Sequence, residues 1–125
     1  MRMDWKDLKK RKLEGKELVI AVAQDYENKQ VAMVAFQDKE AFEVTKKTGE
    51  LHFYSTSKKK LWKKGEVSGN VMLIKETCVD CDGDALLYMV EMTGGACHEG
   101  YDTCFHKTLA GKTVGKKLFD PDKVY

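Results

Sequence analysis

All four cysteines of this chain lie in one short stretch, and the first two stand beside a run of alternating aspartates. The stretch begins Cys78-Val79-Asp80-Cys81-Asp82-Gly83-Asp84 and continues through Cys97-His98 to Cys104. Thiolates suit zinc, whereas clustered carboxylates suit hard cations such as magnesium. Two donor classes interleaved in this way indicate two different metals held side by side, which few structural proteins need. The sequence therefore favours an enzyme, or at least a metal site.

Length and composition limit the classes of protein that this chain can belong to. With 125 residues, it is expected to form one domain that spans residues 1–125. Its 22 lysines and arginines nearly balance 20 acidic residues, so no overall charge points to a nucleic acid or a membrane partner. No apolar stretch approaches the ~20 residues of a membrane span, and no signal-peptide pattern opens the chain. We therefore expect a cytoplasmic protein, whose thiols stay reduced.

The hydrophobic pattern predicts an α+β domain that is rich in strand. Strands are expected over residues 18–23, 30–36, 51–54, 71–76 and 85–92, and the first two form a hairpin. An amphipathic helix is expected over residues 38–47, with Asp38 as its N-cap and Gly49 after its last turn. The polar and basic residues 55–62 are expected to form a loop or a single helical turn.

The spacing of the cysteines leaves two kinds of zinc site open. Cys78 and Cys81 have C-x-x-C spacing, and Cys97 and Cys104 could complete a four-thiolate structural site. A three-thiolate site would instead keep one coordination position open for water, as catalytic zinc requires. Because three thiolates make the site negative, zinc would acidify that water only weakly, and a nearby base would help. His98, next to Cys97, is the candidate for that base.

Asp80, Asp82 and Asp84 occupy alternate positions, so in an extended segment their carboxylates would converge on one face. Three carboxylates so close together repel one another unless a cation neutralises them, and magnesium fits this role. The alternative is a solvated acidic loop before a strand. A calcium loop is disfavoured, because residues 85–88 read as a strand where such a loop would continue.

Residues 55–70 combine hydroxyls, lysines and glycines, which are the ingredients of a phosphate-binding loop. Trp62 could stack on a base or a ribose in such a loop. The alternative is a solvated basic loop with Trp62 in the core, and lysine runs more often face water.

Three segments, in this order and at these intervals, resemble the phosphoribosyl-AMP cyclohydrolases of histidine biosynthesis. They are Leu-Trp-Lys-Lys-Gly-Glu-Val-Ser-Gly-Asn at 61–70, Asp-Cys-Asp-Gly-Asp-Ala-Leu-Leu at 80–87, and Cys-His-Glu-Gly at 97–100 followed by Cys104-Phe105. The resemblance covers residues 34–105, and the combination of the first two segments is very specific.

The resemblance implies a definite reaction. The adenine ring of 1-(5-phosphoribosyl)-AMP would be opened between N1 and C6 by zinc-activated water with magnesium, which is the third step of histidine biosynthesis. The product would be the formimino aminoimidazole carboxamide ribotide, and the enzyme a hydrolase acting on cyclic amidines. The chain would be the monofunctional form, without a fused pyrophosphohydrolase domain. The implied fold is a mostly β, small pseudo-barrel with a capping helix, formed as an interlocked homodimer.

Carried over by motif, the same resemblance implies roles for individual residues. The zinc ligands would be Cys81, Cys97 and Cys104, shared across the dimer, with Cys78 as a bystander. The magnesium ligands would be Asp80, Asp82 and Asp84, and His98 would be the catalytic acid or base. The small phosphoribosyl nucleotide carries two phosphates, which call for hydroxyls and cations, and its base calls for an aromatic ring. From their chemistry, the candidates to bind it are Ser55, Ser57, Lys58, Trp62, Lys64 and Ser68.

Some positions depart from the family pattern. Lysine stands where arginine is usual before Leu61, which keeps the charge but loses the bidentate fork. Glu99 stands where a small hydroxyl residue is usual after the Cys-His pair. His52 and His106 lie at variable positions and are expected to be ordinary surface or core histidines.

Two other classes of protein remain alternatives. A nucleobase deaminase would use similar zinc chemistry, but it needs a P-C-x-x-C signature, and the single proline, Pro121, lies far from the cysteines. A non-enzymatic zinc module would use Cys78 as a fourth zinc ligand and would tolerate loss of the aspartates.

Overall fold

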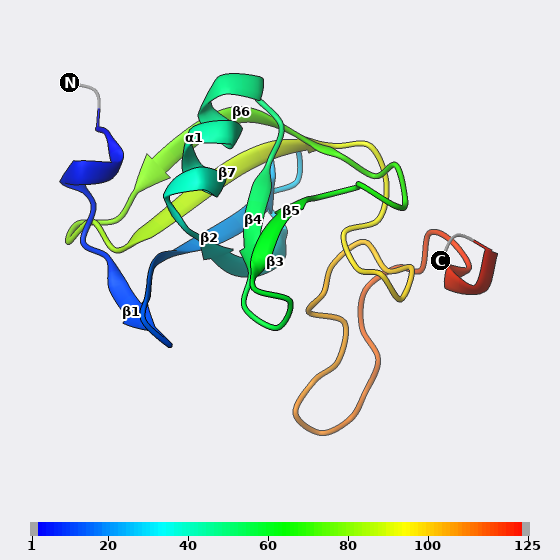
Figure 1. The fold of residues 1–125 in the computed structure, drawn as a ribbon. Coiled ribbons are helices and arrows are strands. Elements are labelled where there is room, and N and C mark those ends of the chain that lie inside the picture. Colours follow the sequence, from blue (N-terminus) through cyan, green and yellow to red (C-terminus); the bar gives the residue numbers. More distant parts are fainter. Residues whose placement is uncertain (1–2, 124–125) are drawn as a thin grey trace.

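One strongly curled sheet dominates the computed structural model, which describes residues 3–123 (Figure 1). Its strands are β1 (Arg11–Leu13), β2 (Lys16–Asp25), β3 (Val31–Gln37), β4 (His52–Ser55), β5 (Lys60–Lys63), β6 (Met72–Val79) and β7 (Ala85–Met92). The order across the sheet is β5-β4-β3-β2-β7-β6, with β1 paired to β2 off this path. Neighbouring strands are antiparallel, except that β2 and β7 run parallel. This β-dominated half-barrel with one α-helix confirms the expected fold class.

The β2–β3 hairpin defines the two faces of the sheet, because successive side chains of a strand point to opposite sides. Val19, Ala21 and Ala23 of β2 face the inside of the curl and are buried. Ile20 points to the outer face, where it pairs with Phe36 of β3, and both side chains are exposed. The sheet therefore has a buried inner face and an apolar outer face.

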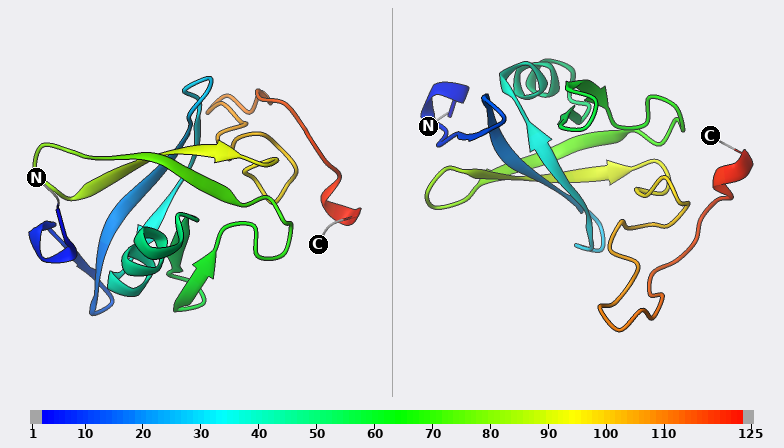
Figure 2. Two further views of the ribbon diagram at one scale, coloured as in Figure 1. Left: turned by 90° about the horizontal axis from the view of Figure 1, so that it is seen from above. Right: turned by 60° about the horizontal axis from the view of Figure 1, so that its bottom comes forward.

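Helix α1 (Lys39–Thr48) lies against the inner side of the curl (Figures 1 and 2). The Asp38 carboxylate accepts a hydrogen bond from the Ala41 N–H at 2.9 Å, and Gly49 ends the helix in the left-handed region at φ 74°. Phe42 packs against Trp5 of the short 3-10 turn η1 (Trp5–Asp7), with 5.7 Å between ring centroids. The predicted helix and both of its caps are confirmed. No helix within residues 3–123 is long and apolar enough to cross a membrane.

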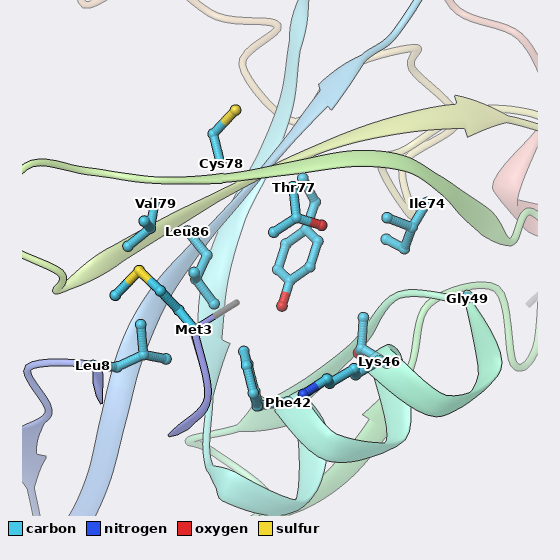
Figure 3. Close-up of a pocket in the computed structure, with 12 residues that line it drawn as sticks. Met3, Leu8, Phe42, Lys46, Gly49, Ile74, Thr77, Cys78, Val79 and Leu86 are labelled. Atoms are coloured by element: carbon cyan, nitrogen blue, oxygen red, sulfur yellow. The ribbon is translucent and has the colours of Figure 1, made fainter. Parts of the chain in front are cut away.

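Backbone hydrogen bonds close one end of the curl. The Leu51 N–H donates to the Met72 carbonyl at 2.9 Å, and the Ile74 N–H donates to the Gly49 carbonyl at 2.8 Å. Further along β6, a mostly apolar cleft of about 510 Å³ remains between this strand and α1. Figure 3 shows Phe42 and Leu86 facing this cleft from opposite sides. None of the residues predicted to bind metal or substrate lines this cleft.

The expected loop or helical turn over residues 55–62 is wrong for its second half. A tight turn follows Ser55, and β5 then pairs with β4 in register, with Ser55 opposite Lys60. Lysines at a sheet edge hide the alternating pattern that marks a strand. Strand β6 continues to Val79, beyond its predicted end at residue 76. A bulge between Ile74 and Glu76 shifts the alternation of its side chains between the two faces, which hides the last residues of the strand in the sequence pattern. The short strand β1 was not expected either, and all of its residues are exposed.

Candidate metal and substrate site

The segment that follows β7 returns to the start of β3 and brings two cysteines together. The Cys104 N–H donates to the Ala32 carbonyl at 2.7 Å, and the Thr103 hydroxyl donates to the Val31 carbonyl at 2.7 Å. Cys97 opens a tight loop in which its N–H donates to the Tyr101 carbonyl at 3.1 Å. These anchors hold the Cys97 and Cys104 thiols within hydrogen-bonding contact of each other.

A buried lysine lies beside the two thiols. Lys64 is only 5% exposed, and its ammonium donates to the Ala96 carbonyl. Burial raises the pKa of the Cys104 thiol to about 11, Cys97 adds to the rise, and Lys64 opposes it. Burial also lowers the pKa of Lys64, against the opposing effect of the two cysteines. Two close thiols beside a buried ammonium form a donor set that suits a metal able to displace the thiol protons.

Cys81 does not join this pair within one chain. It lies in the turn between β6 and β7, before Ala85, whereas Cys97 follows the other end of β7 at Met92. A strand of this length spans ~23 Å. Figure 1 shows the β6–β7 turn and the segment after β7 at opposite ends of the strand. A single chain therefore offers two thiols for zinc at this point, and the four-thiolate alternative is not assembled within it.

The three aspartates of the β6–β7 turn do converge, although the extended segment expected for them is wrong. Their carboxylate oxygens lie within 4.8 Å of one another. The cause is a tight turn, in which Asp80 accepts hydrogen bonds from the N–H groups of Asp84 at 2.9 Å and Ala85 at 3.2 Å. The turn folds the carboxylates together, where strand alternation was expected to do so.

Crowding of these carboxylates changes their pKa values in opposite directions. Hydrogen bonding to the Asp80 and Asp82 carboxyls raises the pKa of Asp84, while Arg11, 3.3 Å away, opposes the rise. Desolvation raises the pKa of Asp80, but hydrogen bonds from Asp84, Ala85 and Asp82 outweigh it and leave that pKa lowered. A shared proton thus relieves the repulsion. A hard divalent cation relieves it more fully, so the residues fit magnesium.

A second cleft, of about 600 Å³, collects the residues predicted to bind the substrate. Its lining includes Ser55, Ser57, Lys58, Trp62, Lys64 and Ser68, together with His98 and Cys104. Residues from three separate parts of the sequence therefore face one cavity that reaches Cys104.

Two local structures shape this cleft. The Ser55 and Ser57 hydroxyl oxygens lie 3.3 Å apart, and the Lys58 N–H donates to Ser55, so the turn before β5 presents both hydroxyls together. Gly65 has φ 86°, and a Cβ there would lie 2.5 Å from the Asn70 carbonyl carbon. Only glycine therefore allows the loop over residues 65–70 to close on itself.

Other lining residues were missed. Met33, Lys60 and Glu66 also face the cleft. Glu66 belongs to the segment quoted for the family resemblance, which could have singled it out. Nothing in the local sequence marks Met33, because only the curl of the sheet turns this residue of β3 toward the cavity. His52 and His106, expected to be ordinary surface or core histidines, are both buried.

Comparison with known proteins gives one consistent result. The model of the phosphoribosyl-AMP cyclohydrolase family matches residues 33–106. A relative from Haloarcula marismortui is 55% identical over 109 residues, which cover 87% of this chain and 91% of the relative. A relative from Methanosarcina barkeri is 53% identical over 110 residues, which cover 88% and 85%. Both relatives carry the name phosphoribosyl-AMP cyclohydrolase.

Proposed function

The chain belongs to the phosphoribosyl-AMP cyclohydrolase family, and we propose from this that it opens the adenine ring of 1-(5-phosphoribosyl)-AMP in histidine biosynthesis. The bond broken lies between N1 and C6, and the product is the formimino aminoimidazole carboxamide ribotide, at the third step of the pathway. The observation that supports this most is one cleft lined by His98, Cys104 and the predicted substrate residues. A cytoplasmic setting suits this chemistry, because the thiols must stay reduced.

Two metals belong to the proposal. Cys97 and Cys104 would hold zinc together with Cys81 of the partner subunit, and Asp80, Asp82 and Asp84 would hold magnesium. When bound, zinc supplies an activated water for attack on C6, and magnesium supplies positive charge for the phosphates or for orienting water. The close thiols and the converged carboxylates support these two assignments.

His98 is the residue we assign to proton transfer. It faces the cleft next to Cys104, and it is exposed, so its ring can contact a bound substrate. Ribosylation at N1 makes the ring cationic, so C6 is already electrophilic. The outcome then depends on which nitrogen leaves: a proton given to N1 by His98 opens the ring and keeps the exocyclic nitrogen.

The remaining lining residues divide between the substrate and the thiols. The Ser55–Ser57 turn with Lys58 offers hydroxyls, an N–H and a positive charge for a phosphate group. Trp62 packs on Phe53 with 5.4 Å between ring centroids and still faces the cleft, where it can stack on the base. The buried ammonium of Lys64 compensates the charge of the two thiolates.

The outer face of the sheet is where we place the second copy of the chain. Ile20 and Phe36 form one cross-strand pair there, and Val22 and Val34 form the next. The two-fold axis would lie between the two outer faces, perpendicular to β7 and level with the middle of that strand. It would pack the two faces together with their β7 strands antiparallel. The turn that carries Cys81 of one chain would then lie over the end of β7 that leads to Cys97 of the other. The same packing covers the apolar face and completes the zinc site.

Val34→Asp is expected to convert the dimer to monomers, because Val34 is 47% exposed and the proposed packing buries its side chain among apolar neighbours. Sedimentation equilibrium measures the change, and the catalytic activity should fall with the dimer fraction. Leu13→Asp is the matched control, since Leu13 is 45% exposed on β1 and lies away from the outer-face pairs of β2 and β3. A Val34→Asp protein that stays dimeric and active would refute this interface.

A turnover assay tests the reaction itself. Protein loaded with zinc and magnesium is mixed with phosphoribosyl-AMP, ring opening is followed by ultraviolet absorbance, and free ammonia is measured in the same samples. We expect ring opening without ammonia. Ammonia release would identify a deaminase, and full zinc occupancy without any reaction would favour a structural zinc module.

A further inference from the structure

Cys97 has two sets of neighbours, and only one set is used by the proposed zinc site. The first set is Cys104 and Lys64. The second set is Glu99 and His106, and one ligand atom from each of Cys97, Glu99 and His106 lies within 4.8 Å of the others. Ligands around a tetrahedral zinc ion are ~3.5 Å apart, given bonds of ~2.0–2.3 Å. A movement of about 1 Å by the exposed Glu99 side chain and the loop that carries it would close the set around an ion.

The His106 ring is held in place before any ion binds. The residue is 6% exposed, and its ring stacks on Tyr101 with 4.0 Å between centroids and 10° between planes. Its Nε2 lies 3.3 Å from a carboxylate oxygen of Glu99. The Val114 N–H donates to the His106 carbonyl at 2.7 Å, which fixes the backbone. Little conformational entropy would therefore be lost on binding.

A role in packing alone does not explain a histidine at this position. Its Nδ1 is the one fully buried side-chain nitrogen or oxygen without a hydrogen-bond partner among residues 3–123. Leaving a buried polar atom unpaired lowers the stability of the folded protein. A phenylalanine would fill the same stack on Tyr101 without that cost. The imidazole thus gives up stability that an apolar ring would keep, as expected for a residue retained for its other nitrogen, Nε2, which faces Glu99.

We propose that Cys97, Glu99 and His106 form a second transition-metal site, which one chain can fill without its partner. Thiolate, imidazole and carboxylate together select zinc or cobalt(II) over magnesium or calcium. The site shares Cys97 with the cysteine pair, so an ion is held either by this set or by the shared cysteines. A chain that lacks the partner's thiol can then still retain its metal. The proposal concerns metal binding and does not depend on the reaction.

The test uses a Cys81→Ser/Cys104→Ser double variant, in which the shared site has lost two of its three thiols while Cys97 remains. We expect it to bind one cobalt(II) ion per chain, with the visible bands of a tetrahedral ion and a weak sulfur-to-metal charge-transfer band. Adding His106→Phe or Glu99→Gln should weaken cobalt(II) binding at least ~10-fold. Adding Cys78→Ser or Glu91→Gln, which change an exposed thiol and an exposed carboxylate elsewhere, should leave it unchanged.

Thermal unfolding of the metal-free protein separates a ligand from a packing residue. His106→Phe keeps the stack on Tyr101 and removes the unpaired nitrogen, so we expect an unchanged or higher Tm without metal and a smaller Tm rise when cobalt(II) is added. If the double variant does not fold, the same pair of measurements is made in Cys81→Ser alone. The proposal is overturned if the parent variant binds no cobalt(II), or if His106→Phe binds it as tightly as its parent.

Discussion

Two inactive variants, Cys81→Ser and Cys97→Ser, should regain activity when one subunit of each is combined in a mixed dimer. Each variant alone lacks one zinc ligand in both sites, and losing the metal's several kcal/mol of transition-state stabilisation is expected to lower kcat/KM by ~10³ or more. In the mixed dimer, one site takes Cys97 and Cys104 from the Cys81→Ser chain and Cys81 from the Cys97→Ser chain, so it has all three thiols. By two-fold symmetry, all the defects fall in the other site, so about half of the wild-type activity should return.

The measurement uses co-expression with two different affinity tags, purification over both, and assay of the doubly tagged dimers. The matched control combines Cys97→Ser with Cys104→Ser, since each of these defects damages the site to which its own chain contributes the cysteine pair. That mixed dimer has no complete site and should stay inactive. Recovery in the control, or none in the Cys81 and Cys97 pair, would show that Cys81 does not serve the partner's site.

This prediction depends on β7, the strand that the hydrophobic pattern predicts over residues 85–92. The motif spacing placed Cys81, Cys97 and Cys104 in one short stretch, but β7 occupies most of the interval between the first and second cysteine. The strand spans ~23 Å, and the two cysteines follow its opposite ends. Closeness along the chain therefore becomes separation in space, and this supports a site shared by two chains.

Elements with strong local signals were predicted well. The Asp38 N-cap and the Gly49 C-cap enclose α1, and each works through hydrogen bonds or backbone geometry within one turn. The β2–β3 hairpin likewise follows from two apolar runs around a short polar turn. In these segments the neighbouring residues determine the conformation.

Features set by turns and by pairing with a neighbouring segment were not predicted. The edge strand β5 forms because β4 pairs with it, although lysines dominate its sequence. The aspartates converge because Asp80 binds the N–H groups of Asp84 and Ala85, which simple alternation does not foresee. The contacts of His106 with Tyr101 and Glu99 arise only when the segment after β7 folds back on itself. Each of these depends on how the chain turns back on itself, which the alternation of polar and apolar residues does not encode.

Asp82→Asn should abolish most of the activity while zinc stays bound. Asp80 also holds the backbone of the turn, and Asp84 also pairs with Arg11, so Asp82 is the position where a loss of charge disturbs the turn least. Without its carboxylate, the cluster has less negative charge to hold magnesium, and we expect kcat/KM to fall by ~10³ at a fixed magnesium concentration. Steady-state assays at increasing magnesium should recover part of the loss, because weaker binding is offset by mass action.

Metal analysis and a matched variant separate a lost magnesium site from a damaged fold. Asp82→Asn should keep its full zinc content, because it leaves all three cysteines in place and does not remove the Asp80 hydrogen bonds that hold the turn around Cys81. Glu76→Gln removes an exposed carboxylate from β6, close to the same turn but outside the cluster, and should retain wild-type activity and magnesium dependence. If Asp82→Asn retained wild-type activity at limiting magnesium, the aspartates would be a solvated acidic turn, and the second metal would have to bind elsewhere.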